Sequence, residues 1–276
     1  MNKKKRHVST GLTYFTVIIA ALLLLFPIYW MIIISLKSRL DIFSYPPKFF
    51  FFEIYDNYKA PFFEDVYFKY LVNSLLIAAG NAAIVMPISL FAAYAFSRYK
   101  FYGDESLFFW TLTNRMAPAA IFIIPYYIMY NYMGLLDTHI GLILVYGVFN
   151  IPFAVWLLKS FLDGVPKDLD RAALLDGCSV LSVIRRIIIP ICKPGIAVST
   201  IMIMLFSWNE FLFASVLTRV NARTLPSGLA GFITVVGIYW GRIAAVATVA
   251  LIPALILVYV LQRYIIAGLT LGAVRG

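Results

Sequence analysis

Residues that could do metal or nucleophilic chemistry are few and scattered along the chain. The two cysteines, Cys178 and Cys192, are fourteen positions apart, a spacing that fits no zinc motif. The two histidines, His7 and His139, have no neighbouring cluster of carboxylates or cysteines. We therefore predict no metal site, no catalytic residue and no bound cofactor in this chain.

The strongest local pattern is a polar segment over residues 159–193, which predicts two helices joined by a bend. Pro166 suits the first turn of a helix, because its missing N–H needs no partner there. Gly177 can take the left-handed conformation that ends a helix, and Ser179 can cap the next one. This is more order than a connection needs, so we interpret the segment as a docking element for a cytoplasmic partner.

The elements that carry these residues are long apolar runs. The 276 residues are 62% hydrophobic and 13% charged, whereas soluble domains are about 45–50% apolar and about 25% charged. This composition excludes a secreted globular protein, a disordered tail and a nucleic-acid-binding domain, and predicts a single all-α membrane domain over 1–276. A spanning helix needs about 20 apolar residues. Six runs are of this kind: 12–36, 70–96, 106–130, 139–158, 194–217 and 243–266.

The distribution of basic residues predicts the orientation of these spans. Of the 23 Lys and Arg residues, 14 fall at the N-terminus, in the tail and in the loops after the second and fourth spans, against 8 in the other loops. By the positive-inside rule we expect both termini in the cytoplasm. The net charge of +10 then reports topology rather than a nucleic-acid partner. Cys178 and Cys192 would face a reducing compartment, where a disulfide is not expected.

The polar segment resembles the EAA loop of ABC importer permeases. The shared pattern is Ala-Ala, three residues, Gly, nine residues, then Ile-x-x-Pro. In that family this loop forms the coupling helix, which sits in a cleft of the ATPase subunit. Two residues depart from the motif, because Arg171 stands where the family has Glu and Ile189 where it has Leu. The resemblance implies that these residues couple to the ATPase: Arg171, Ala172, Ala173, Asp176, Gly177, Ile187 and Pro190.

The resemblance extends over about 200 residues, from the second span to the end. Arg115-Met116-x-Pro118 is similar to a pattern of the carbohydrate-uptake branch, and Trp208-Asn209-Glu210-Phe211 is similar to its Trp-Asn-x-Phe. The C-terminal residues 268–276 resemble those of the G-type subunits of maltose permeases. The resemblance implies a type I importer fold with six transmembrane helices and a cytoplasmic coupling helix.

The family also implies partners and a location. We expect a second permease subunit, two ATPase subunits that bind ATP and Mg, an extracytoplasmic solute-binding protein, and a bacterial or archaeal inner membrane around them. The expected function is alternating-access import of a sugar, oligosaccharide or polyol. The chain has no phosphate loop of the form G-x-x-x-x-G-K-S/T, so ATP hydrolysis must belong to a partner chain.

Polar residues within the spans are candidates for the translocation path. An ionisable group in a span is costly and usually faces protein or water. We hypothesise a salt bridge between Arg115 and Glu210; alternatively, each lies near an interface and snorkels. Four further residues could either line a sugar path or hydrogen-bond between helices. They are Asn114, Asn150, Trp208 and Asn209.

Two other classes of function remain as alternatives. A membrane-embedded enzyme would need clustered acids or histidines near an interface. The sole acidic cluster is Asp163, Asp168, Asp170 and Asp176, which we interpret as helix-dipole and docking groups. An ion-coupled secondary carrier would usually carry more buried acids or an internal repeat. Glu210 is one membrane carboxylate, and no repeat is apparent.

Overall fold

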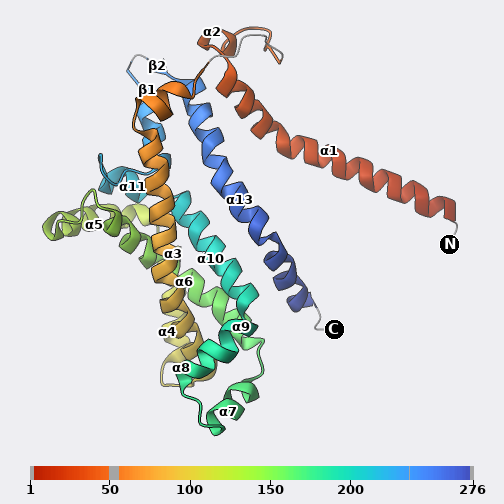
Figure 1. Ribbon diagram of the computed structural model, residues 1–276, viewed down its shortest axis with the longest axis vertical. Coiled ribbons are helices and arrows are strands. Elements are labelled where there is room, and N and C mark those ends of the chain that lie inside the picture. Colours follow the sequence, from red (N-terminus) through yellow and green to blue (C-terminus); the bar gives the residue numbers. More distant parts are fainter. Residues whose placement is uncertain (1–2, 50–55, 236, 274–276) are drawn as a thin grey trace. The chain divides into compact units, whose positions relative to one another are not determined.

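The computed structural model describes residues 3–49, 56–235 and 237–273, which are mostly helical (Figure 1). Four of the described helices are each long and apolar enough to cross a membrane, and each coincides with one of the six predicted runs. They are α1 (Lys3–Leu36), α3 (Tyr67–Arg98), α6 (His139–Asp163) and α13 (Trp240–Ala273). The last residues of the C-terminal resemblance, 274–276, lie outside the described residues.

Two further candidate spans are bent pairs of helices. α4 (Asp104–Met116) and α5 (Ala119–Met133) meet at 90°. The bend lies at Pro118, because a residue that precedes a proline is disfavoured in a helix. The segment Val180–Ile191 meets α10 (Lys193–Trp208) at 83°. The count reaches six among the described residues if each bent pair is one span.

The predicted fifth run, 194–217, is wrong as a continuous helix. α10 ends at Trp208, and a new helix, α11, covers Leu212–Leu217. The Glu210 carboxylate starts this helix by accepting hydrogen bonds from the backbone N–H groups of Phe213, at 2.9 Å, and Ala214, at 3.1 Å. Apolar residues continue through the break, so hydropathy does not reveal it.

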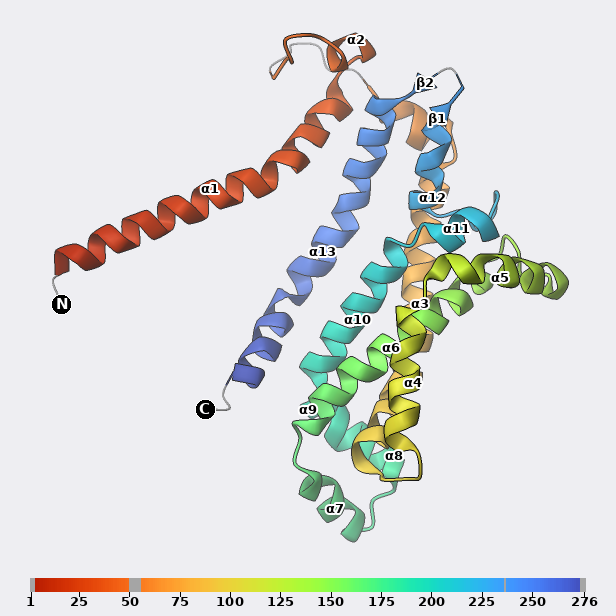
Figure 2. The same ribbon diagram turned by 180° about the vertical axis from the view of Figure 1, so that it is seen from behind.

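The chain forms two compact units. The first comprises Met1–Phe68 and Gly231–Leu251, and the second Lys69–Ala230 and Ile252–Gly276. Besides α1, the first unit holds short elements that Figure 2 labels or traces. They are α2 (Arg39–Ile42), the π-helix η1 (Ala60–Glu64), most of the 3-10 turn η3 (Ala230–Phe232), β1 (Ile233–Thr234) and β2 (Gly237–Ile238).

Buried polar and aromatic contacts hold the first unit together. The two strands are antiparallel, with Ile233 opposite Ile238. The buried Asn57 amide donates to the carbonyl of Ser35 at 3.0 Å and to that of Lys37 at 2.9 Å. These bonds satisfy backbone carbonyl groups that have no partner within the helix at the C-terminal end of α1. The ring of Tyr67 stacks on that of Phe232 at 4.5 Å between centroids.

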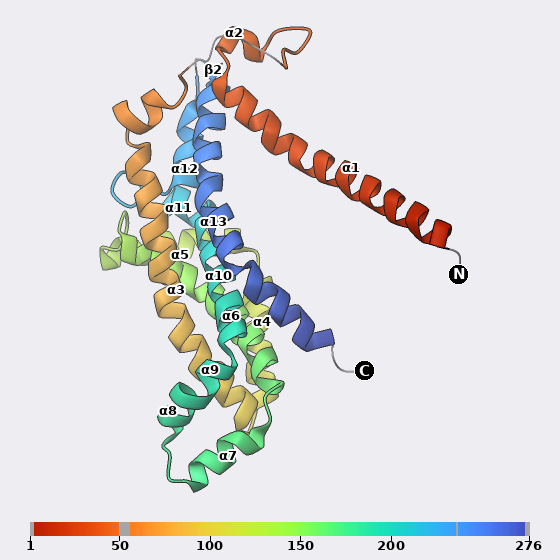
Figure 3. The same cartoon turned by 45° about the vertical axis from the view of Figure 1, so that its right-hand side comes forward.

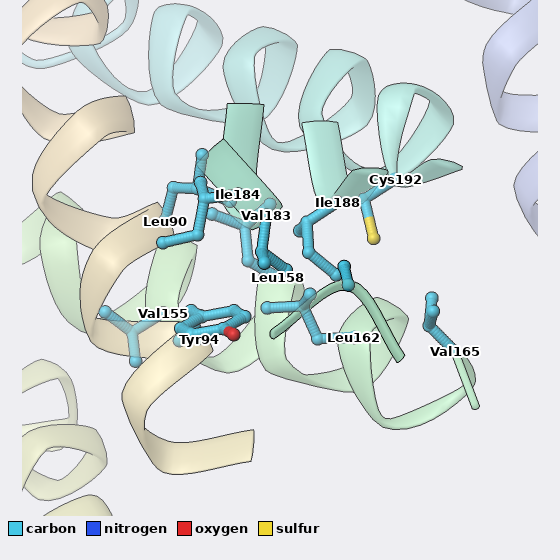
Figure 4. Packing of buried hydrophobic residues seen from close by; sticks show 12 residues of the cluster. Leu90, Tyr94, Val155, Leu158, Leu162, Val165, Val183, Ile184, Ile188 and Cys192 are labelled. Carbon is cyan, nitrogen blue, oxygen red and sulfur yellow. The ribbon is translucent and has the colours of Figure 1, made fainter. Parts of the chain in front are cut away.

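The second unit is organised around α6, which packs against α4 and α10 (Figure 2). An apolar cluster of twelve buried residues lies toward the end that carries α7 and α8 (Figure 3). Figure 4 shows Tyr94 of α3, Leu158 and Leu162 of α6, and Val183 and Ile188 of the following segment converging there. This cluster fixes the polar segment to the spans.

A loop at the other end of the second unit is fixed by one carboxylate. Asp137 accepts hydrogen bonds from the backbone N–H groups of residues 219–222, at 3.0 to 3.2 Å. Burial alone would raise the pKa of Asp137, but these N–H donors outweigh burial and lower the pKa. The helix α12 (Leu225–Leu229) follows this loop.

Candidate functional site

The polar segment after α6 folds as predicted, as two helical stretches joined by a bend. Its elements are α7 (Lys167–Leu175), α8 (Val180–Val183), the π-helix η2 (Ile184–Ile188) and α9 (Ile189–Ile191). Gly177 ends the first stretch with a φ of +82°, a conformation that favours glycine. The Ser179 hydroxyl caps the second stretch by accepting from the N–H of Ser182 at 3.3 Å.

The predicted coupling residues divide between an inner and an outer face of this segment. Ala173 is 9% exposed and packs in the same apolar cluster as Leu158 and Leu162, where it holds α7 to the spans. Ile187 is half-buried beside the same cluster. The remaining predicted residues are exposed: Arg171, Ala172, Asp176, Gly177 and Pro190.

Several large apolar side chains of α7 and α8 lie open beside these exposed residues. Leu175 is 89% exposed and Leu181 is 62% exposed, and Leu169, Leu174 and Val180 are also exposed. Large apolar side chains exposed on two successive short helices favour a surface where another protein binds. We call these five residues the α7–α8 apolar patch.

A buried ion pair, which the sequence did not predict, fastens α7 to the end of α3. Arg98 bonds to the Asp170 carboxylate, and the two side chains are 5% and 6% exposed. The Arg98 guanidinium also donates to the carbonyls of Leu162, at 3.0 Å, and Val165, at 3.3 Å. Asp170 lies in the first turn of α7, as its interpretation as a helix-dipole group expects. Its carboxylate is buried against Arg98, however, so it is an internal anchor and is not exposed for docking. In the sequence, Arg98 is one basic residue after the second span, and nothing in its pattern predicted a partner.

Three of the predicted path residues, Arg115, Asn150 and Glu210, line a cavity of about 370 Å³ within the second unit. Residues from α4, α5, α6, α10, α11 and the connections between them line it. They are Arg115, Ala117, Ala119, Tyr146, Phe149, Asn150, Phe206, Glu210 and Phe213. We call this space the α4–α11 cavity.

Arg115 and Glu210 both line this cavity, but they form no ion pair in the described part of the chain. The Arg115 guanidinium donates to the Phe149 carbonyl at 2.8 Å and lies over the Phe206 ring, 4.2 Å from its centroid. The Glu210 carboxylate instead accepts from the start of α11. The hypothesised salt bridge is therefore wrong, because each group has a different partner.

The predicted path residues have different environments. Asn150 lines the cavity, yet its amide also donates to Asn81 at 2.8 Å and Ser207 at 3.1 Å, so it hydrogen-bonds between helices. Asn209 donates to the Leu205 carbonyl of its own helix at 2.8 Å. Trp208 is buried and Asn114 is exposed, and neither lines the cavity.

Sequence reasoning missed Tyr146, which presents a polar group to the cavity. Tyr146 is 2% exposed. Its hydroxyl interacts with the Glu210 carboxylate. Because Tyr146 stands in an apolar run where aromatic residues usually pack in a core, no signal in the sequence singled it out.

Comparison with known proteins gives the family. Residues 85–270 match the family described as binding-protein-dependent transport system inner membrane component. The chain is 32% identical to the diacetylchitobiose uptake system permease protein DasC of Streptomyces coelicolor, with 95% of each chain covered. It is also 32% identical to the trehalose/maltose transport system permease protein MalG of Thermococcus litoralis, with 94% of each covered.

The fold has a counterpart among solved structures. It is similar to a chain in the crystal structure of a bacterial ABC transporter involved in the import of the acidic polysaccharide alginate. The TM-score is 0.76 at 20% identity, and the match covers 96% of this chain and 99% of that chain. The chain therefore belongs to the family of inner membrane components of binding-protein-dependent transport systems, as a permease subunit of an ABC transporter whose ATP hydrolysis is done by partner ATPases.

Proposed function

We propose that this permease imports a sugar, oligosaccharide or polyol by alternating access. The observation that carries the proposal is the near full-length similarity to permeases named for diacetylchitobiose and for trehalose and maltose. A cavity within the spans that combines aromatic walls with hydroxyl, amide and charged groups supports it, because sugars offer both apolar faces and hydroxyl groups.

The test is uptake into proteoliposomes that contain the whole transporter. Radiolabelled trehalose, maltose and diacetylchitobiose are each offered with the loaded binding protein, with and without ATP inside the vesicles. We expect ATP-dependent uptake of at least one of these sugars. Uptake that proceeds equally without ATP would contradict the proposal and favour an ion-coupled carrier.

We further propose that the α7–α8 apolar patch docks on an ATPase subunit. The patch is exposed, while Ala173 and the Arg98–Asp170 pair anchor its helix to the spans from the opposite face. A displacement of this surface by a bound partner would therefore be transmitted directly to α3 and α6. Copurification of the ATPase with patch variants tests the docking.

The remaining parts of the assembly are also proposals. The transporter would comprise this chain, a second permease subunit, two ATPase subunits that hold ATP and Mg, and an extracytoplasmic solute-binding protein. This chain would act as one transmembrane domain with six spans, each bent pair of helices serving as one span. Both termini would lie in the cytoplasm, as the distribution of basic residues indicates.

A further inference from the structure

We propose that the first compact unit holds a binding pocket for the phosphate headgroup of an anionic phospholipid. The pocket has a volume of about 270 Å³, and its lining comes from α2 and the residues beside it, from Asn57 and from the start of α13. We call it the α2–α13 pocket. The inference is independent of the sugar-import function, because it concerns a membrane lipid and not the transported substrate.

The position of this pocket along the chain places it at the boundary of the membrane. The apolar stretches of two candidate spans are Thr13–Leu36 in α1 and Trp240–Val260 in α13. The pocket lining includes Ser38, just after the first stretch ends, and Trp240, where the second begins. Because the headgroup layer borders the apolar core of a bilayer, the pocket lies at the depth of the lipid headgroups.

Two arginines give the pocket its charge. Arg39 and Arg242 line it, and no aspartate or glutamate is among its described lining residues, so their formal charge is +2. Neither guanidinium forms an ion pair with a described residue. Asp41, the acid on α2, pairs with Lys48 instead. An anion in the pocket would balance these charges, and guanidinium groups bind phosphate oxygens through paired hydrogen bonds.

Aromatic side chains also line the pocket and favour a lipid over a free anion. Phe43, Tyr239 and Trp240 are all exposed, and the Arg242 guanidinium lies over the Tyr239 ring, 5.1 Å from its centroid. Tyrosine and tryptophan are enriched where a protein crosses the membrane–water interface. A phospholipid offers a phosphate to the arginines and apolar glycerol and chain atoms to the rings, whereas inorganic phosphate would leave the rings uncovered.

The inner side of the pocket is held in place by contacts within the first unit. Asn57 is buried and its amide donates to the carbonyls of Ser35 and Lys37 at the end of α1. A Cβ atom added to Gly241 would lie 2.6 Å from the Asn57 Oδ1, so the start of α13 packs closely against Asn57. The pocket is therefore formed before a ligand binds, which lowers the cost of binding.

The experiment is native mass spectrometry of the purified whole transporter in detergent. Phosphatidylglycerol and phosphatidylcholine with identical chains are added in equal amounts, and the bound lipids are counted. The variants are Arg39→Gln alone and Arg39→Gln with Arg242→Gln. The matched control is Arg219→Gln, because Arg219 is an exposed arginine that does not line the pocket.

We expect the wild type to retain phosphatidylglycerol in preference to phosphatidylcholine. Arg39→Gln should weaken phosphatidylglycerol binding about tenfold, the loss of a hydrogen bond to a charged group, and the double variant should abolish the preference. Arg219→Gln should leave it unchanged. The melting temperature of the complex without added lipid should stay the same for Arg39→Gln, since Arg39 has no ion pair in the described part of the chain to lose.

Four outcomes would overturn the proposal. They are equal retention of the two lipids by the wild type, an unchanged preference in the double variant, the same loss with Arg219→Gln, and displacement of the lipid by an equal concentration of inorganic phosphate, which would make a free anion the ligand. Loss of solute-binding-protein copurification in the double variant, with no lipid bound by the wild type, would assign the pocket to a protein partner and equally overturn it.

Discussion

Two ion pairs on α7 show how the same residue types contribute differently according to burial. Arg98 and Asp170 are 5% and 6% exposed, whereas Arg171 and Asp168 are 72% and 88% exposed at a separation of 3.1 Å. Water screens the exposed pair, which should contribute about 0–1 kcal/mol. Removing one partner of a buried pair leaves an uncompensated charge, at a cost of about 3–5 kcal/mol.

We therefore predict that Asp170→Asn strongly destabilises the permease. The substitution keeps the shape of the side chain but leaves the Arg98 charge buried with two carbonyls and a serine hydroxyl as its neighbours. The melting temperature of the detergent-solubilised protein should fall clearly, and Asp168→Asn, on the same helix, should leave it almost unchanged. Equal melting temperatures for the two variants would contradict this account of the anchor.

Asp137 gives a prediction with a pH dependence. Its folded-state pKa is below the ordinary value of 3.8, so its contribution is present above that value and is lost as the pH falls through the folded pKa. As the pH falls below 3.8 the wild type should therefore progressively lose protection of residues 219–222 from proteolysis. Asp137→Asn should already be cleaved faster at neutral pH, with little further change in acid. An equal pH profile for the two proteins would show that other groups fix this loop.

The α7–α8 element was the part of the site that the sequence predicted best. Residues that start or end helices take local conformations that depend little on the rest of the fold. The pattern of Pro166, Gly177 and Ser179 therefore predicted the bend correctly. Which side of the helix faces outward was not predictable in the same way. The motif pairs Ala172 with Ala173, and only tertiary packing sends Ala173 into the cluster.

This division of faces decides which substitutions test docking. Gly177 has a φ of +82°, so replacing it strains the backbone, and enlarging Ala173 disturbs the permease's own core. Leu175 is 89% exposed, so replacing it neither strains the backbone nor disturbs the core. We predict that Leu175→Asp reduces copurification of the ATPase and ATP-dependent uptake, with the permease still inserted in the membrane.

The matched control for this test is Leu40→Asp. Leu40 is 86% exposed on another short helix, α2, so the change in hydrophobicity at an open position is the same. We expect this variant to retain the ATPase. Normal copurification with Leu175→Asp, or equal loss with Leu40→Asp, would contradict docking at the α7–α8 apolar patch.

At the scale of the whole molecule, apolar composition located the spans but not their interruptions. The break at Pro118 has a local cause, and the sequence indicates it. The end of α10 depends on Glu210 turning its carboxylate to the N–H groups of α11, which composition does not reveal. The cavity was unpredictable for the same reason, because Tyr146 and Phe213 meet Arg115 only when separate helices pack.

Charge bias, in contrast, acts over the whole chain and yields a prediction about topology. If the basic side is cytoplasmic, a cysteine replacing Leu175 should be shielded from a membrane-impermeant maleimide in intact cells and labelled after permeabilisation. A cysteine replacing Tyr45, which is 96% exposed in the loop after the first span, should be labelled in intact cells. Both variants need Cys178→Ser and Cys192→Ser, since both native thiols are free. The reverse labelling pattern would place both termini outside. Labelling of both sites in intact cells would contradict the predicted topology, because three spans between Tyr45 and Leu175 must put the two residues on opposite sides of the membrane.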